Sequence, residues 1–221
     1  MRNMILSTLF VAALAVGFSL IIGVGCALFL ACAATDRQRT LVMPYIDLLA
    51  SIPSVIYGFI GLYIVVKFFE KLGRATGESI LAGGITQGVM ILPFIQVRAE
   101  KALREVDPAL VKASYGLGMS RAYTIRRVVL PQALPQLVSG VLLGGCYAMG
   151  AAAPLIFTGA VIISKVPKDV MKPAMALPYH LYMLLTQGTS SENAYGTAFV
   201  MMVIVLVTNS VATWFAWRKK K

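Results

Sequence analysis

Long apolar runs separated by short charged turns dominate this sequence. A helix needs about 20 predominantly apolar residues to cross the roughly 30 Å hydrocarbon core of a bilayer, and five runs are long enough. The pattern predicts an all-α polytopic membrane protein with about five transmembrane helices, forming one domain over residues 1–221. The expected spans are Met4–Ala34, Met43–Phe69 interrupted by Pro53, Ile80–Val97 interrupted by Pro93, about Ala133–Ile163 containing Pro154, and Ala194–Trp217.

Composition and charge support this class. Apolar residues make up 58% of the chain and charged residues only 13%, which is unlike a soluble domain. The net charge of +11 comes from cations at the ends of apolar runs, so it reflects membrane topology and not nucleic-acid binding. The three cysteines lie inside apolar runs without paired metal-ligand spacing, which indicates small buried hydrophobic residues.

The distribution of cations predicts an orientation. Residues 35–40, 98–131 and the C-terminus fall on one side of the membrane and hold thirteen Lys and Arg, whereas the other side holds seven. Cytoplasmic loops carry the excess of positive charge. We therefore expect the N-terminus outside and the C-terminus in the cytoplasm.

The stretch Arg98–Pro131 is the only long polar passage between apolar runs. It predicts a short helix that Asp107 caps, with Pro108 in the first turn and Gly118 as the stop. One face of this helix is small or apolar, and Lys112 and Ser114 point elsewhere. The residues on that face are Ala109, Leu110, Ala113 and Leu117. Such a helix on a membrane protein has little core to bury, so we expect it to dock on a soluble partner.

The spacing within this stretch resembles a known loop. A pattern in permease subunits of binding-protein-dependent ABC importers has a similar spacing. In this chain the pattern reads Lys112-Ala113-Ser114, then three residues, Gly118, nine residues, and residues 128–131 (Val-Val-Leu-Pro). The family pattern has Glu, Ala and Ile where this chain has Lys112, Ser114 and Val128. A plain solvated basic loop is the alternative. The resemblance implies a coupling helix that sits in a groove of the ATP-binding subunit, with contacts from Asp107, Ala109, Leu110, Ala113, Ser114, Gly118 and Arg121.

The resemblance extends over most of the chain. Residues 47–58, 150–158 and 175–182 are similar to stretches of phosphate-importer permeases. This implies a type I ABC importer core in a bacterial or archaeal cell membrane, carrying phosphate or a related oxyanion. The implied partners are an ATP-binding cassette dimer, a second and non-identical permease, and an extracytoplasmic binding protein that docks near residues 164–195. This chain would bind no cofactor, since the partner subunit uses the ATP. Relative to six-span members, the resemblance leads us to expect that the first helix is missing from this sequence.

Two positions depart from the phosphate subgroup. Where its members carry an Arg and a Glu around the Gly-Glu-Thr-Ala-Pro stretch, this chain has Tyr147 and Ala151. An anion crossing a low-dielectric region needs compensating positive charge or several hydrogen-bond donors. Either a second permease supplies that charge, which we favour, or the cargo is not phosphate.

Neutral polar groups are the candidates for the substrate pathway. Ser51, Ser54 and Tyr57 are spaced by three residues around Pro53, and Tyr147 and Thr158 lie in the fourth span. They could donate to an oxyanion, or bond to carbonyls freed by the proline or to neighbouring helices.

Charged residues near the spans receive structural interpretations. We expect Asp47 to pair with Arg37 or Arg39, and Arg98 to extend toward the membrane border. Glu100, Glu105 and Asp107 would be solvated among the cations of their loop.

The segment 164–195 is too polar to span and predicts a surface segment with a short amphipathic helix around Ala174–Leu185. The single His180 in it has no neighbouring carboxylate or cysteine, which argues against a ligand or catalytic role.

No phosphate-binding loop, zinc motif or nucleophile elbow occurs, so the sequence predicts no enzyme. The alternative classes are an ATP-independent secondary transporter or channel, which would need mid-membrane acidic residues or inverted repeats, and a membrane scaffold.

Overall fold

A computed structural model describes residues 2–73, 77–159, 169–188 and 190–217, and these residues form helices without a strand. The first span is one rod of 31 residues that ends at Cys32. A π-helical turn interrupts its α-helical hydrogen bonding near the middle. Its parts are α1 (Arg2–Ser19), η1 (Leu20–Val24) and α2 (Gly25–Cys32).

The second segment is bent and not straight. Its axis turns by 94° at Ile52 and Pro53, and it begins in the polar turn rather than at Met43. The early start has a local cause, because Thr35 and Gln38 form a capping box there. Its parts are α3 (Asp36–Ser51), α4 (Ser54–Gly61), η2 (Leu62–Val66) and α5 (Lys67–Lys71).

Helix α6 (Ile80–Arg104) is the centre of the fold. It packs against α1, α2, α3, α4, α9 and α10. The helix continues through Pro93 and past Val97, so the expected third span was too short. Its charged end remains helical because Ala99, Ala102 and Leu103 are buried against neighbouring helices.

The fourth span differs from the expectation at both ends. A continuous rod of 30 residues runs from Arg121 to Gly150, and it includes the polar stretch that was expected to be a loop. Ala151 is extended, at φ −85° and ψ 108°, and this residue ends the rod. Residues 160–163 of the expected span lie outside the described residues. The elements are α7 (Pro108–Gly116), α8 (Arg121–Thr124), η3 (Ile125–Val129), α9 (Leu130–Gly150) and α10 (Ala153–Thr158).

Helices α11 (Leu177–Gln187) and α12 (Ser191–Trp217) complete the chain. Helix α11 confirms the short helix expected around Ala174–Leu185, shifted by two to three residues. Residues 164–168 and 189 of the expected outer segment, and the basic residues 218–221, lie outside the described residues.

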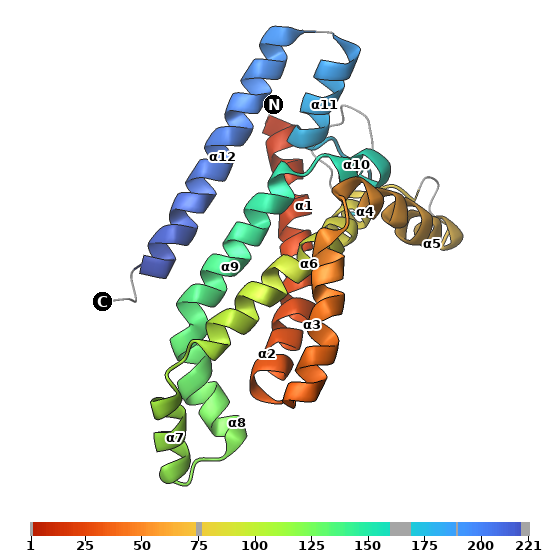
Figure 1. The fold of residues 1–221 in the computed structure, drawn as a ribbon. Coiled ribbons are helices and arrows are strands. Elements are labelled where there is room, and N and C mark those ends of the chain that lie inside the picture. The colour runs from red at the N-terminus through yellow and green to blue at the C-terminus, as the bar shows by residue number, and fades with distance from the viewer. Residues whose placement is uncertain (1, 74–76, 160–168, 189, 218–221) are drawn as a thin grey trace.

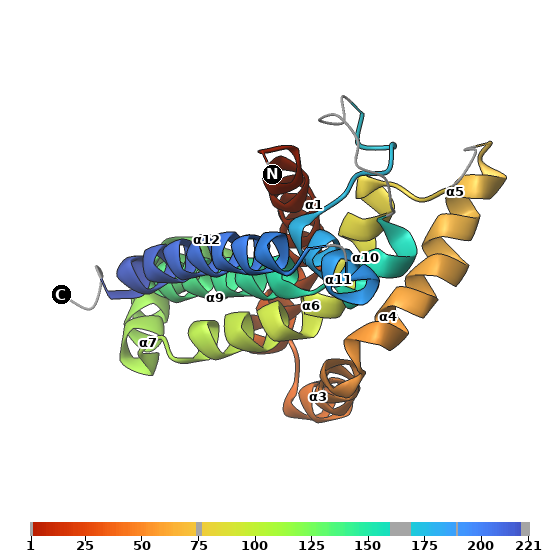
Figure 2. The same ribbon diagram turned by 90° about the horizontal axis from the view of Figure 1, so that it is seen from above.

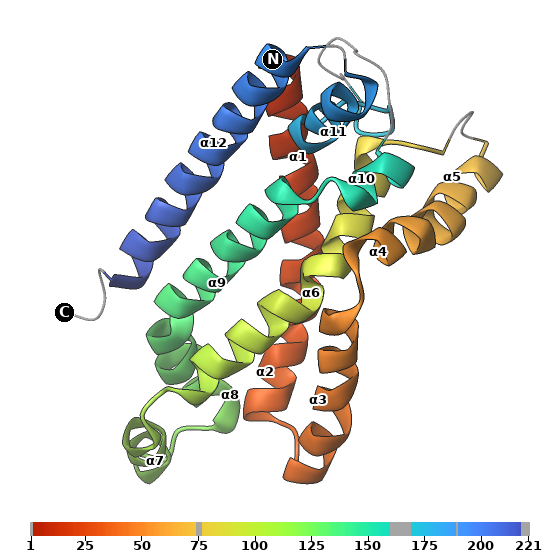
Figure 3. The same cartoon turned by 45° about the horizontal axis from the view of Figure 1, so that its top comes forward.

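The helices form an elongated bundle (Figure 1). Helix α12 lies beside α9, and α6 packs against α9 on the side nearer the viewer of Figure 1. Helices α7 and α8 lie at the same end as the α2–α3 turn, whereas α11 and the N-terminal end of α1 lie at the opposite end (Figures 1 and 3). From above, α4 and α5 project away from the bundle (Figure 2). Within the described residues, the count is four straight spans and one bent pair, which agrees with about five.

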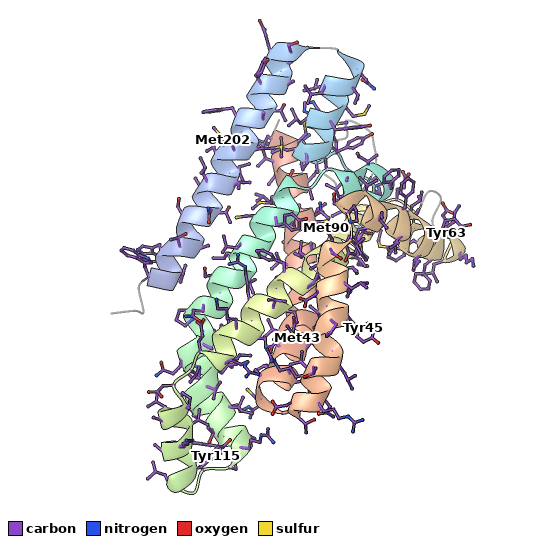
Figure 4. All side chains as sticks on the ribbon, in the orientation of Figure 1. Met43, Tyr45, Tyr63, Met90, Tyr115 and Met202 are labelled. Carbon is purple, nitrogen blue, oxygen red and sulfur yellow. The ribbon has the colours of Figure 1, made fainter. Side chains whose placement is uncertain are left out.

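Much of the apolar surface faces outward. Tyr45, Tyr63 and Met202 point away from the bundle (Figure 4) and are 71%, 80% and 52% exposed. By contrast, Met90 lies between helices and is 4% exposed. Large exposed apolar side chains are expected where lipid or a partner helix covers them.

Candidate functional site

The start of α7 follows from its first residues. Oδ1 of Asp107 accepts a hydrogen bond from the backbone N–H of Ala109 at 2.8 Å, and Pro108 occupies the first turn. The cap satisfies one of the backbone donors that every helix start leaves free. The predicted N-cap is confirmed.

The end of α7 is a Schellman motif around Gly118, whose φ is +76°. The N–H of Gly118 donates to the carbonyl of Tyr115 at 2.9 Å, and the N–H of Met119 donates to the carbonyl of Ser114 at 3.1 Å. The last helical residue is Gly116, and Gly118 provides the left-handed conformation that turns the chain, as predicted.

The two faces of α7 differ. Ala109, Leu110, Ala113 and Leu117 are all exposed, and Leu117 is 76% exposed. Tyr115 is also exposed, and Figure 4 shows it on α7 at the end of the molecule. The predicted apolar face therefore points away from the bundle and is free to meet another protein.

The opposite face attaches α7 to the bundle. Ser114 is 4% exposed, and its Oγ lies 3.0 Å from Oγ1 of Thr124, which is fully buried. The Ser114 hydroxyl also donates to the carbonyl of Val111 at 2.7 Å, so Thr124 donates to Ser114. The guanidinium of Arg121 donates to the carbonyl of Cys32 at the end of α2. Ser114 and Arg121 thus fix α7 and α8 to the spans, whereas the four residues of the exposed face do not.

A cavity of about 680 Å³ lies between α7 and the ends of the spans, and no motif pointed to it. Four cations and one carboxylate are among its lining residues. They come from α3, α6, α7 and α8, so only the tertiary fold brings them together. These residues are Asp36, Arg39, Arg104, Lys112 and Arg121.

The three polar residues around Pro53 do not share one helix face, because the 94° bend separates Ser51 in α3 from Ser54 and Tyr57 in α4. The Ser51 hydroxyl donates to the carbonyl of Leu48 at 2.8 Å. The Tyr57 hydroxyl donates to the carbonyl of Leu49 at 2.7 Å, across the bend. These two hydroxyls satisfy carbonyls near the proline break.

A second cavity, of about 430 Å³, lies between the bend, α6 and α9. Tyr57 and Tyr147 line it, but Ser51, Ser54 and Thr158 do not. Two charged residues that had received structural interpretations line it as well, Asp47 and Arg98. Of the predicted pathway residues, the structure therefore brings together only the two tyrosines.

Thr158 and the α9–α10 break have structural partners. The Thr158 hydroxyl is fully buried and donates to the carbonyl of Pro154 at 2.8 Å. At the break, Nε2 of Gln87 donates to the carbonyls of Ala148 at 3.2 Å and Ala151 at 2.9 Å. The α6 side chain thus satisfies the backbone that the helix break leaves free.

The carboxylates near α7 differ from expectation. Glu100 is 2% exposed and pairs with Arg39, so it is not solvated, and Arg39 is not the partner of Asp47. The reason is the extension of α6, which carries Glu100 into the bundle interior. Glu105 remains on the surface near Lys101, at 3.8 Å.

Comparisons with known proteins identify relatives over nearly the whole chain. The family model "Binding-protein-dependent transport system inner membrane component" matches residues 19–221. The "Probable ABC transporter permease protein YqgH" of Bacillus subtilis is 41% identical over 132 residues, which are 59% of this chain and 43% of that protein. The match thus spans less than half the length of that relative. The "Phosphate transport system permease protein PstA 2" of Mycobacterium bovis is 27% identical over 227 residues, covering 100% of this chain and 73% of that protein.

The fold also has a solved counterpart. A chain of the inward-facing MetNI methionine ABC transporter superposes with a TM-score of 0.77 at 20% identity, covering 95% of this chain and 91% of that one. This likeness shows the type I importer fold. Together with the family match, it shows that the chain belongs to the inner membrane components of binding-protein-dependent transport systems, the permease subunits of ABC importers.

Proposed function

We propose that this permease subunit carries phosphate or a related oxyanion and is driven through α7 by an ATP-binding subunit. The observation that carries the coupling role is the exposed face of α7, where Leu110 and Leu117 are 43% and 76% exposed at the end of the bundle. The relatives named as phosphate permeases support the cargo.

The proposal includes the partners that an importer needs. An ATP-binding cassette dimer binds α7 and uses the ATP, so this chain itself needs no cofactor. A second, non-identical permease encloses the pathway, and an extracytoplasmic binding protein delivers the cargo near α11. In the cell membrane, the N-terminus is outside and α7 is cytoplasmic, as the excess of cations near α7 favours.

Substitution on the exposed face of α7 tests the coupling role. Leu117→Asp places a charge where the apolar face meets the ATP-binding subunit, and we expect co-purification to fall at least about tenfold. Leu185→Asp is the matched control, because Leu185 is 65% exposed on α11, at the opposite end of the molecule. Unchanged binding of the ATP-binding subunit by Leu117→Asp would show that α7 is not the docking surface.

Uptake by the reconstituted complex tests the cargo. Proteoliposomes containing both permeases and the ATP-binding subunit, supplied with binding protein, should accumulate labelled inorganic phosphate in an ATP-dependent manner. Excess sulfate, a tetrahedral oxyanion like phosphate, and methionine, a zwitterion of different shape, serve as competitors. Uptake of methionine without phosphate would overturn the oxyanion proposal but leave the coupling role intact.

A further inference from the structure

The cavity of about 430 Å³ between the bend, α6 and α9 lies within the membrane-spanning part of the chain. Its volume falls in the range of small-molecule sites, about 300–1,000 Å³. Apolar residues such as Ile52, Met90 and Phe94 form most of its wall. Two phenols, one carboxylate and one guanidinium are the polar groups, from Tyr57, Tyr147, Asp47 and Arg98.

The Arg98 side chain points toward the middle of its span. Its guanidinium carbon lies 4.4 Å from the ring centroid of Phe94, one helical turn before Arg98. A side chain extending to the nearer end of α6 would point toward Arg104 instead. The guanidinium of Arg98 therefore lies beside Phe94, within the apolar helix Ile80–Arg104.

Small and aromatic neighbours hold Arg98 in this position. A Cβ at Gly140 in α9 would lie only 3.2 Å from Cβ of Arg98, so the glycine lets the arginine stem pass close to α9. On the other side, the Phe94 ring stacks on Tyr147, with centroids 6.1 Å apart. The arginine, the phenylalanine and the tyrosine thus form a continuous row along the cavity.

The charge of Arg98 is not used by an ion pair. In the part of the chain that the structure describes, the ion pairs are Arg39–Glu100, Lys67–Glu70 and Lys101–Glu105. Asp47 lines the same cavity but forms no ion pair with Arg98. A guanidinium inside a span is costly, and such residues commonly mark a substrate or ion pathway.

The hydroxyls divide into two kinds. The Tyr57 hydroxyl donates its proton to the carbonyl of Leu49, so toward the cavity it can only accept. Tyr147 is 50% exposed, and no side-chain hydrogen bond engages its hydroxyl among the described residues. It can therefore donate to an anion beside the guanidinium, whose planar N–H groups match the oxygens of phosphate.

We propose that this cavity is an oxyanion subsite of the transport pathway, in which Arg98 supplies the positive charge and Tyr147 a neutral donor. The subsite rests on the proposed function, import of phosphate or a related oxyanion. Asp47, on the α3 wall, offsets part of the charge, and this keeps binding weak enough for the anion to leave, as passage requires. This chain then contributes positive charge to the pathway through α6, although Tyr147 and Ala151 are neutral.

Charge removal and charge relocation test the subsite in the reconstituted complex. Arg98→Gln should lower ATP-dependent uptake of inorganic phosphate by at least about tenfold, because the charge-assisted hydrogen bonds are lost. Arg98→Lys should retain part of the uptake, since it keeps the charge without the planar donors.

Arg98→Gln combined with Tyr147→Arg should regain uptake, because position 147 lines the same cavity. Asp47→Asn should lower the phosphate concentration needed for half-maximal uptake.

Arg37→Gln is the control, because Arg37 is an exposed cation of α3 that does not line this cavity. Assembly should stay at wild-type level in all these variants, and uptake and basal ATPase activity of Arg37→Gln should equal those of the wild type. Wild-type uptake by Arg98→Gln would overturn the subsite. The subsite would also be overturned if Arg98→Gln lost both uptake and assembly and Tyr147→Arg did not restore them. That result would assign Arg98 a structural role. If the wild-type complex imports only neutral or cationic solutes, the proposed oxyanion cargo is wrong. That result is obtained without any variant, so it is distinguishable from failure of the subsite alone.

Discussion

Nε of Arg39 in α3 lies 2.6 Å from Oε1 of Glu100 in α6. The Glu100 side chain is 3% exposed, and its second oxygen lies 3.5 Å from Nε2 of Gln96. Oε1 of Gln96 is buried without a hydrogen-bond partner. The Arg39–Glu100 ion pair joins the bent α3–α5 arm to α6, about one turn before α6 ends. It therefore connects the arm to the segment that carries α7.

Removing the arginine should destabilise the protein. Arg39→Gln leaves the buried Glu100 carboxylate without its cation, and we expect a loss of about 1–3 kcal/mol, reduced because Arg39 is partly exposed. The melting temperature of the purified protein in detergent measures the effect. Adding Glu100→Gln should restore most of the stability, since the amide is uncharged and can donate to Gln96. Equal melting temperatures for wild type and Arg39→Gln would show that the pair contributes little.

The hydrogen bond across the bend should stabilise the arm. Tyr57→Phe removes the hydroxyl that donates to the carbonyl of Leu49 at 2.7 Å and leaves that carbonyl without this donor. We expect a loss of about 1 kcal/mol and faster hydrogen exchange of backbone amides in residues 49–57. Tyr45→Phe is the control, because Tyr45 is 71% exposed on α3. Unchanged exchange in residues 49–57 of Tyr57→Phe would contradict this role.

A threonine of the first span should hold the start of α11. Oγ1 of Thr8 accepts a hydrogen bond from the backbone N–H of Leu177 at 2.8 Å, and both residues are buried. Thr8→Val keeps the shape but leaves this N–H unpaired, at an expected cost of about 1–3 kcal/mol. Thr8→Ser keeps the acceptor and should behave like wild type. Thermal unfolding of the three proteins compares them, and equal stability of the valine and serine variants would exclude the bond as a contributor.

Acid should loosen the contact between α11 and α12. Burial lowers the pKa of His180 below its ordinary 6.5, and Nδ1 of His180 lies 3.3 Å from Oγ1 of Thr197. The unfolded segment then binds a proton more readily than the folded one. The contribution of neutral His180 to the stability of the folded segment is therefore complete above pH 6.5 and is lost as the pH falls through the folded pKa. Because His180 is the single histidine, the protection factors of the α11 amides, which correct for the slower intrinsic exchange at lower pH, should fall on acidification in wild type but not in His180→Gln. The same fall in both proteins would assign it to another group.

Local sequence patterns predicted α7 well. Asp107, Pro108 and Gly118 act within one turn of their own positions, so neighbouring residues decide the start and the end of this helix. The same logic failed for the fourth span. The charged beginning of this span at Arg121 stays helical. Its last turn ends at Ala151, although alanine favours helices, because packing and the Gln87 side chain stabilise the break there.

Charged residues were the least predictable part of the candidate site. Arg39 and Glu100 are 61 positions apart, and nothing in either neighbourhood indicates the pairing. The guanidinium of Arg98 lies over Phe94, and α9 passes close to the arginine stem at Gly140. Such contacts depend on where two helices cross, which a single span does not encode.

By itself, the sequence determined that the chain is a helical membrane protein with about five spans and a capped polar helix between two of them. Bilayer thickness and bonds within one helical turn decide those features, and both can be read along the chain. Only the tertiary structure decided that Asp47, Tyr57, Arg98 and Tyr147 share one cavity. These four residues come from four separate helices, and the 94° bend at Pro53 together with the approach of α6 to α9 sets the distances between them.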